Sequence, residues 1–319
     1  MKTILKYALA AVAIIIVVGL FAAWRMARTP PGPGDKAWQA MIEKQGWSRW
    51  TDPGGYRLHY IEAGQGPPVV LLHGYGDRAY TWHLNIPALV EAGHHVLAWD
   101  LPGLGRSETP PGFDFSAEAV LGQLIRFLDI QGLDRVAVVG SSLGGNLALL
   151  LAVRHPERVS KVVAVDPAAY PSKRHASYQR LARWPLLVDL LRPFVGKSAI
   201  RYGLTRSYHD PSRVDEAGVS ERAQVLRRPD FMDNMVKLGA NYFSASHRIL
   251  VPRYPDIQAP VLIVWGDDDR LIPVAGNAER LHRDIPGSKL VLLEKAGHAA
   301  HEEQAAAFNR AVIDFLAAP

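Results

Sequence analysis

The order of apolar and polar residues divides most of the chain into strand-length and helix-length segments. Short apolar runs of strand length occur at 56–62, 67–72, 95–99, 135–139, 159–165, 261–265 and 289–293. Segments with the apolar spacing of a helix occur at 116–130, 143–154 and 302–316. Strands that are apolar throughout and alternate with helices are typical of a parallel sheet buried on both faces. The pattern therefore predicts an α/β fold with a mostly parallel central sheet and helices on both faces.

One long stretch departs from this alternation. Residues 166–258 have helical character and no strand pattern. Because an irregular loop of that length is uncommon in a compact domain, we expect a helical insertion there. The expected division is a first core part at 46–170, a helical cap at 171–255 and a second core part at 256–319.

The N-terminus begins with a different kind of segment. Residues 7–24, YALAAVAIIIVVGLFAAW, form an uninterrupted apolar run. As a helix these residues would span about 27 Å, close to the roughly 30 Å hydrocarbon core of a bilayer. Basic residues lie on both flanks, at Lys2, Lys6, Arg25 and Arg28. The run therefore predicts a single transmembrane helix.

The predicted transmembrane helix implies a domain organisation for the chain and a location for the protein. We expect a membrane anchor at 1–28 and a proline- and glycine-rich linker at 29–45, with the catalytic domain outside the cytoplasm. A cleaved signal peptide is the main alternative, although no small-x-small cleavage site closes the apolar run. A buried globular helix is a third interpretation.

The amino-acid composition and the net charge argue against several classes of function. Hydrophobic residues make up 48% and charged residues 21% of the chain, which is ordinary for a globular protein. The net charge of +5 favours anionic surfaces, but no basic tract interleaved with aromatics indicates nucleic acid. The chain has no cysteine, which excludes disulfides, a cysteine nucleophile and thiolate metal sites.

The sharpest chemical signal is VVGSSLGG at 138–145, which contains a G-x-S-x-G pattern. It follows a predicted strand and precedes a predicted helix. A nucleophile on such a tight turn has a strained backbone and tolerates only small neighbours, which explains the glycines. The pattern makes Ser142 the candidate nucleophile. A glycine-rich turn without catalytic meaning is the alternative.

Three further segments place chemical groups at the ends of predicted strands. They are LLHGYGD at 71–77, VWGDDDRLIP at 264–273 and KAGHAAHEEQ at 295–304. Ligands and catalytic groups collect at the carboxyl ends of the strands in open α/β sheets. His298 is therefore a candidate base, and the three adjacent aspartates at 267–269 are candidate acids.

Together these motifs resemble the α/β-hydrolase superfamily, in the branch with a helical cap. The resemblance runs from about residue 47 to the C-terminus and includes DLPGLGRS at 100–107. It implies a catalytic triad of Ser142, Asp269 and His298, with Asp269 preferred over its two neighbours. It also implies an oxyanion hole made by the backbone N–H groups of Tyr75 and Leu143. The residues expected to support these groups are His73, Gly74, Gly140 and Gly144.

The resemblance implies acyl transfer that needs no metal and no organic cofactor. His298 would accept the proton of Ser142, and Asp269 would orient the imidazole. We expect a carboxylic ester hydrolase acting on a hydrophobic or lipid-like small molecule, because basic and apolar residues interleave in the cap segment 172–206. Carbon–carbon bond hydrolases of the meta-cleavage-product type are the main alternative. Cofactor-free perhydrolases and a non-catalytic binding protein on the same fold are further alternatives.

Overall fold

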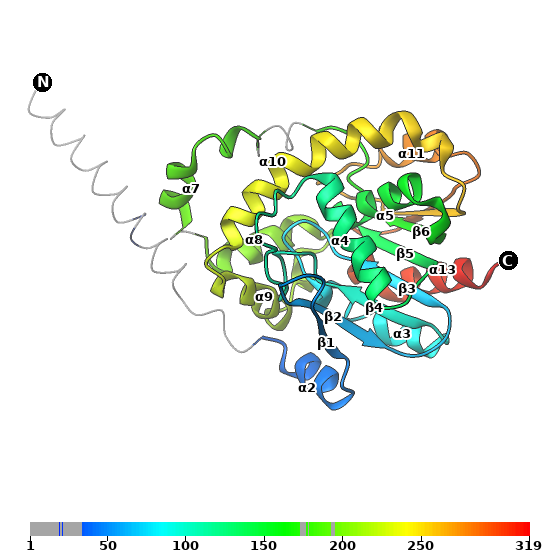
Figure 1. Ribbon diagram of the computed structural model, residues 1–319, viewed down its shortest axis with the longest axis horizontal. Helices are drawn as coiled ribbons and strands as arrows, with labels where there is room; N and C mark the ends of the chain where they lie inside the picture. Colours follow the sequence, from blue (N-terminus) through cyan, green and yellow to red (C-terminus); the bar gives the residue numbers. More distant parts are fainter. Residues whose placement is uncertain (1–18, 20, 22–33, 173–176, 178, 193–194) are drawn as a thin grey trace, which may run out of the picture.

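The computed structural model describes residues 19, 21, 34–172, 177, 179–192 and 195–319. Its centre is an eight-stranded sheet with the strand order β1-β2-β4-β3-β5-β6-β7-β8 (Figure 1). The strands are β1 (Ser48–Thr51), β2 (Leu58–Ala63), β3 (Pro68–Leu72), β4 (His95–Trp99), β5 (Val136–Ser141), β6 (Val159–Val165), β7 (Val261–Gly266) and β8 (Lys289–Leu293). Strands β3 to β8 pair in parallel, whereas β2 pairs antiparallel with both of its neighbours, β1 and β4. The predicted α/β fold with a mostly parallel sheet is confirmed.

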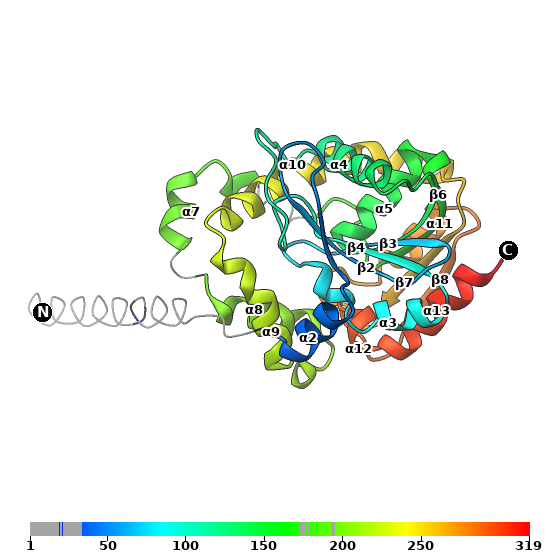
Figure 2. The ribbon, with the colours of Figure 1, turned by 60° about the horizontal axis from the view of Figure 1, so that its bottom comes forward.

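Helices cover both faces of this sheet, as Figure 2 shows. One face carries α4 (Ala117–Ile130), α5 (Leu143–Arg154) and α11 (Ala278–Asp284), and the other carries α3 (Ile86–Glu91) and α13 (Ala305–Ala317). Neighbouring strand residues alternate between the two cores, so that Val138 packs on the first side and Val139 on the second. Burial on both faces explains why the parallel strands have continuous apolar sequences.

The chain between β6 and β7 forms a cap over the carboxyl ends of the strands. Its helices are α7 (Pro185–Leu191), α8 (Lys197–Ser207), α9 (Glu216–Arg222) and α10 (Phe231–Leu250). The described residues of this insertion contain no strand. Helix α10 buries Leu238 and Tyr242 in the core that it shares with α4 and α5. The cap therefore rests on the helix that follows the candidate nucleophile.

Part of the segment expected to be a linker is helical. Residues Lys36–Lys44 form α2, which Asp35 caps by accepting the Trp38 N–H at 3.0 Å. Trp38 and Ile42 are buried in the second core. The Gln39 side-chain amide donates to the Glu221 carboxylate of α9 at 2.6 Å. This segment thus connects the core to the cap.

The predicted transmembrane helix and membrane location need correction. The part of the chain that the structure describes contains no helix long and apolar enough to cross a membrane. Its longest helix, α10, has 20 residues but includes Asp233, Lys237 and Arg248, whose charges are costly in hydrocarbon. Apart from Gly19 and Phe21, the apolar run at 7–24 lies outside the described residues. On this finding the predicted membrane anchor is wrong.

Candidate active site

Ser142 lies at the turn between β5 and α5, with φ 54° and ψ −110°. A positive φ is strained for any residue with a side chain, so the surroundings must hold this conformation. The Ser142 N–H donates to the Val165 carbonyl of β6 at 2.8 Å. A Cβ on Gly140 would collide with the Gly144 carbonyl, and one on Gly144 would collide with the Leu72 carbonyl of β3. The two glycines allow the sharp turn that exposes Ser142.

The loop after β3 passes beside this turn. A Cβ added to Gly74 would lie 3.4 Å from the Ser142 Cβ, so the loop passes within one side-chain atom of the candidate nucleophile. His73 shapes the loop, because its Nε2 accepts the Leu101 N–H at 3.0 Å and its Nδ1–H donates to the Gly74 carbonyl at 2.8 Å. Complete burial lowers the pKa of His73. The imidazole is therefore neutral and structural.

The two expected oxyanion donors belong to the residue after Ser142 and to the loop after β3. Leu143 is the first residue of α5, where backbone N–H groups have no partner within the helix. Tyr75 follows Gly74, and its hydroxyl donates to the Met235 carbonyl of α10. This bond ties the loop to the cap, which fixes the position of the Tyr75 backbone. The oxyanion role of both N–H groups remains a prediction.

His298 lies on the loop after β8 and is held by Asp269, on the loop after β7. The distance from His298 Nδ1 to Asp269 Oδ2 is 2.7 Å. Because the carboxylate can only accept, Nδ1 carries the proton and Nε2 is left to accept one. The other oxygen, Asp269 Oδ1, accepts the N–H groups of Leu271 and Ile272 at 2.7 and 2.8 Å. The buried carboxylate is thus fixed in place.

The structure separates the three adjacent aspartates of the sequence. Asp267 accepts the Ala296 N–H at 3.3 Å. Asp268 is partly exposed and contacts the His209 imidazole at 2.9 Å and Arg270 at 2.6 Å. Asp269 is the one of the three that hydrogen-bonds His298. The choice of Asp269 as the acid is supported by this contact.

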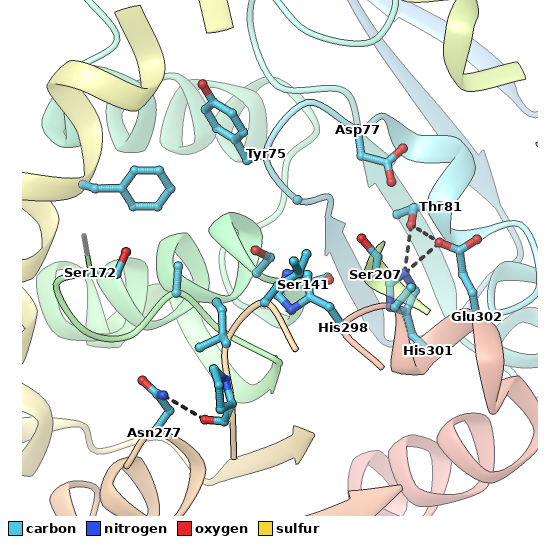
Figure 3. A pocket seen from close by; sticks show the side chains of 18 of the residues that line it. Tyr75, Asp77, Thr81, Ser141, Ser172, Ser207, Asn277, His298, His301 and Glu302 are labelled. Carbon is cyan, nitrogen blue, oxygen red and sulfur yellow. Dashed lines mark hydrogen bonds and ion pairs between the residues drawn. The ribbon is translucent and has the colours of Figure 1, made fainter. Parts of the chain in front are cut away.

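Ser142 and His298 line the same cavity of about 330 Å³ between the core and the cap. In Figure 3, His298 lies beside Ser141, with Thr81 and Glu302 to one side and Ser172 to the other. A larger outer chamber of about 680 Å³ shares lining residues with it. The outer walls are largely apolar and include Ile200, Met232, Met235 and Val236. The site can therefore accept a substrate with an apolar group several carbons long.

A buried ionic cluster forms one wall of the cavity. Arg222 donates to Glu302 at 2.6 Å and to both oxygens of Asp77 at 3.1 and 3.2 Å. Burial favours the neutral form of Glu302, but the Arg222 charge, the nearby histidines and the Thr81 hydroxyl together outweigh it and hold the pKa of Glu302 at about 2. Burial also lowers the pKa of His301 to about 4, so that imidazole is neutral at pH 7. The motifs did not indicate this cluster, because its members are far apart in sequence.

A second acid, Asp166, lies next to the proposed triad and was not predicted as a site residue. Possible ligand atoms of Asp166, Asp269 and His298 all lie within 4.8 Å of one another. The 2.7 Å contact between His298 and Asp269 is a hydrogen bond, which leaves no room for a metal ion between those two atoms. The group is therefore a hydrogen-bonded pair with an additional acid. Its signal in the sequence was its place directly after the strand 159–165.

The strained turn thus presents Ser142 to the same cavity as His298, whose imidazole is hydrogen-bonded to the buried Asp269. Proteins built in this way hydrolyse substrates through a serine nucleophile. A family model described as the alpha/beta hydrolase fold matches residues 67–305. The chain belongs to this family, and it is a hydrolase.

The chain is also similar to individual hydrolases and to solved structures. The chain is 34% identical to a 2-hydroxy-6-oxononadienedioate/2-hydroxy-6-oxononatrienedioate hydrolase of Burkholderia vietnamiensis, over 82% of this chain and 91% of the relative. It is 32% identical to a 2-hydroxy-6-oxo-6-phenylhexa-2,4-dienoate hydrolase of Burkholderia cepacia, over 82% and 92% of the two chains. A solved structure of a hydrolase with that second name, from a Rhodococcus species, is similar with a TM-score of 0.72 and 25% identity, covering 85% of this chain and 98% of the other.

Proposed function

We propose that the protein is a serine hydrolase of carbon–carbon bonds, and that its substrate is a ketone of the 2-hydroxy-6-oxo-dienoate class. The observation that carries this proposal is the similarity to hydrolases of such compounds over more than nine-tenths of their length. This reading differs from the ester hydrolysis expected from the motifs. Both reactions begin with attack of a serine on a carbonyl carbon, so the same three side chains serve either one.

The chemistry requires a carbon leaving group. Transfer of the enol hydroxyl proton to carbon 5 gives a 2,6-diketone, and Ser142 Oγ then adds to the carbon 6 carbonyl while His298 Nε2 takes its proton. The N–H groups of Tyr75 and Leu143 would stabilise the oxyanion. The bond between carbons 5 and 6 breaks, its electron pair delocalises toward the 2-oxo group, and His298 returns the proton. Water then hydrolyses the acyl-serine ester and releases a carboxylic acid.

A second candidate is hydrolysis of an uncharged carboxylic ester, and the apolar walls of the outer chamber favour it. The dienoates carry a carboxylate, which needs a cation in the site. Two arginines line the outer chamber: Arg206, and Arg222, which is already paired with the carboxylates of Asp77 and Glu302. The two arginines and the two carboxylates sum to zero, so the lining has no net charge that selects for or against an anionic substrate. The apolar walls of the outer chamber fit a neutral substrate equally well.

A comparison of the rates with two classes of substrate tests the proposal. The purified full-length chain is assayed with 2-hydroxy-6-oxo-6-phenylhexa-2,4-dienoate, followed by loss of its visible absorbance, and with p-nitrophenyl esters of increasing chain length. The proposal predicts a kcat/KM for the dienoate at least about 100-fold above that for the best ester, a difference of about 2.7 kcal/mol in transition-state stabilisation. Ester turnover without dienoate turnover would replace it by the second candidate. The Ser142→Ala variant is the control for both activities.

A further inference from the structure

A side chamber of about 690 Å³ adjoins the candidate catalytic cavity. It lies between the C-terminal end of α10, α11 and the segment that follows β6. Tyr170, Pro171 and Ser172 of that segment line both the side chamber and the catalytic cavity. In Figure 3, Ser172 lies on the side of His298 away from Glu302. The side chamber is therefore on the flank of the site opposite the ionic cluster.

The charged side chains that line the side chamber are basic. They are Arg248 of α10 and Arg280 of α11, with Gln179 and Ser244 as polar neighbours. No carboxylate is among the described residues of this lining. Burial lowers the pKa of His247, so its imidazole is neutral at pH 7. The lining thus carries two positive charges, whereas those of the outer chamber and the catalytic cavity together sum to zero.

Both arginines have N–H donors left for a bound anion. Arg248 is exposed and forms no ion pair with the described residues. The Arg280 guanidinium lies 4.0 Å from the centre of the Tyr170 ring, and its Nε is 3.4 Å from Asp284 Oδ2. The Tyr170 hydroxyl donates to the same carboxylate oxygen at 2.6 Å. Arg280 is thus held over a residue that lines both cavities, and Arg248 keeps its positive charge without an acidic partner.

The side chamber is within reach of a substrate on Ser142. The Ala168 N–H donates to the Ser142 carbonyl at 3.0 Å, and Tyr170 is two residues further along the chain. Two residues of extended chain span at most about 7 Å. In a 2-hydroxy-6-oxo-dienoate, four carbon atoms separate the attacked carbonyl carbon from the carboxylate. A substrate with that carbonyl at Ser142 can therefore point its carboxylate past Tyr170 toward Arg280, and its apolar group into the outer chamber.

We propose that the side chamber is the subsite for the carboxylate of the substrate, and that Arg248 and Arg280 select for this group. This inference rests on the proposed function, because a neutral ester offers no group that the two arginines would bind. Hydrogen bonds between a guanidinium and a carboxylate are about twice as strong as those between neutral groups. The carboxylate takes no part in the bond changes at the carbonyl, so the two arginines stabilise the bound substrate and the transition state alike. Their loss should therefore raise KM more than it lowers kcat.

A pair of substrates that differ only in this charge tests the role of the side chamber. The full-length chain is assayed with 2-hydroxy-6-oxo-6-phenylhexa-2,4-dienoate and with its methyl ester. We expect Arg248→Gln and Arg280→Gln each to lower kcat/KM for the acid at least about 5-fold, and the double variant at least about 30-fold. The kcat/KM for the methyl ester should change less than about 2-fold. Arg248→Lys keeps the charge and should retain most of the activity on the acid.

Arg283→Gln is the matched control, since Arg283 is an exposed arginine of α11 that is not among the residues lining the side chamber. It should leave kcat/KM for both substrates within about 2-fold of wild type. Equal losses on the acid and its methyl ester, or no loss on either, would overturn the role of the two arginines while carbon–carbon hydrolysis stands.

A pair of esters separates this inference from the proposed function. In 4-(benzoyloxy)butanoate, four atoms also separate the attacked carbonyl carbon from the carboxylate, and pentyl benzoate is the neutral counterpart. The Arg248 and Arg280 variants should lose activity on the anionic ester alone. This selective loss in a chain that does not cleave the dienoate would overturn the proposed function and leave the carboxylate subsite standing. An equal loss on both esters would overturn the subsite.

Discussion

Asp269→Asn is the substitution whose effect follows most directly from the hydrogen bonds of the site. Asp269 Oδ1 accepts the N–H groups of Leu271 and Ile272, at 2.7 and 2.8 Å. In the variant, the amide oxygen must stay at this position because only it can accept. The amide NH₂ then points at His298 Nδ1, which must become an acceptor. The proton of the imidazole moves to Nε2, and His298 loses its ability to take the proton of Ser142.

The magnitude follows from the loss of this tautomer. Replacing the acid of a serine triad by its amide lowers kcat about 10⁴-fold, which corresponds to about 5.5 kcal/mol in the activation barrier. The fold should be retained, with a change of less than about 1 kcal/mol in the free energy of unfolding, because the bonds to Leu271 and Ile272 remain. Steady-state kinetics and thermal unfolding measure the two quantities. A variant with more than about a tenth of the wild-type kcat would refute the proposed role of Asp269.

Three further predictions concern the turn, the ionic cluster and the pocket. Gly144→Ala should lower the free energy of unfolding by at least about 2 kcal/mol, since its Cβ would meet the Leu72 carbonyl, whereas Gly122→Ala, with open space on α4, should be neutral or stabilising in the same urea titration. The pKa of Glu302 is lowered from 4.5 to about 2, so its charge contributes about 3 kcal/mol of stability above pH 4.5, and this is lost as the pH falls toward 2. Glu302→Gln should therefore be less stable than wild type at pH 7, with a difference that narrows through that window, and a constant difference would contradict the assignment. Leu204→Trp, at the junction of the two chambers, should lower kcat/KM for substrates with a large apolar group more than for acetate esters, and an equal loss would contradict the chamber's role.

Much of the sheet and of the candidate chemistry could be predicted because both leave local signals. Continuous apolar runs marked the parallel strands, and the glycines around Ser142 are required because a Cβ at Gly140 or Gly144 would collide with neighbouring backbone. Short β1 was missed because its four residues are exposed or half-buried and carry no apolar pattern. Among the three adjacent aspartates, only contact with His298 in space distinguishes Asp269.

The parts that could not be predicted depend on contacts between distant segments. Arg222 is 80 residues from Glu302 in the sequence and 145 from Asp77, and no local sequence pattern predicts either ion pair. Asp166 had one signal in the sequence, its place after a strand. Its hydrogen bond to Gly266 of β7 and its position next to Asp269 involve residues about 100 positions away. Helix α2 was assigned to a linker because its stabilising partners, such as Glu221, lie in the cap.

The proposed nucleophile is tested most directly by locating the site of covalent modification. The full-length chain is treated with a fluorophosphonate, and the modified residue is located by mass spectrometry in wild type, Ser142→Ala and Ser141→Ala. If Ser142 is the nucleophile, labelling of Ser142 is stoichiometric, abolished by Ser142→Ala and retained in Ser141→Ala, the neighbour in the same turn. Labelling that survives in Ser142→Ala, or no labelling of a chain shown to be folded, would contradict the proposal that Ser142 is the nucleophile.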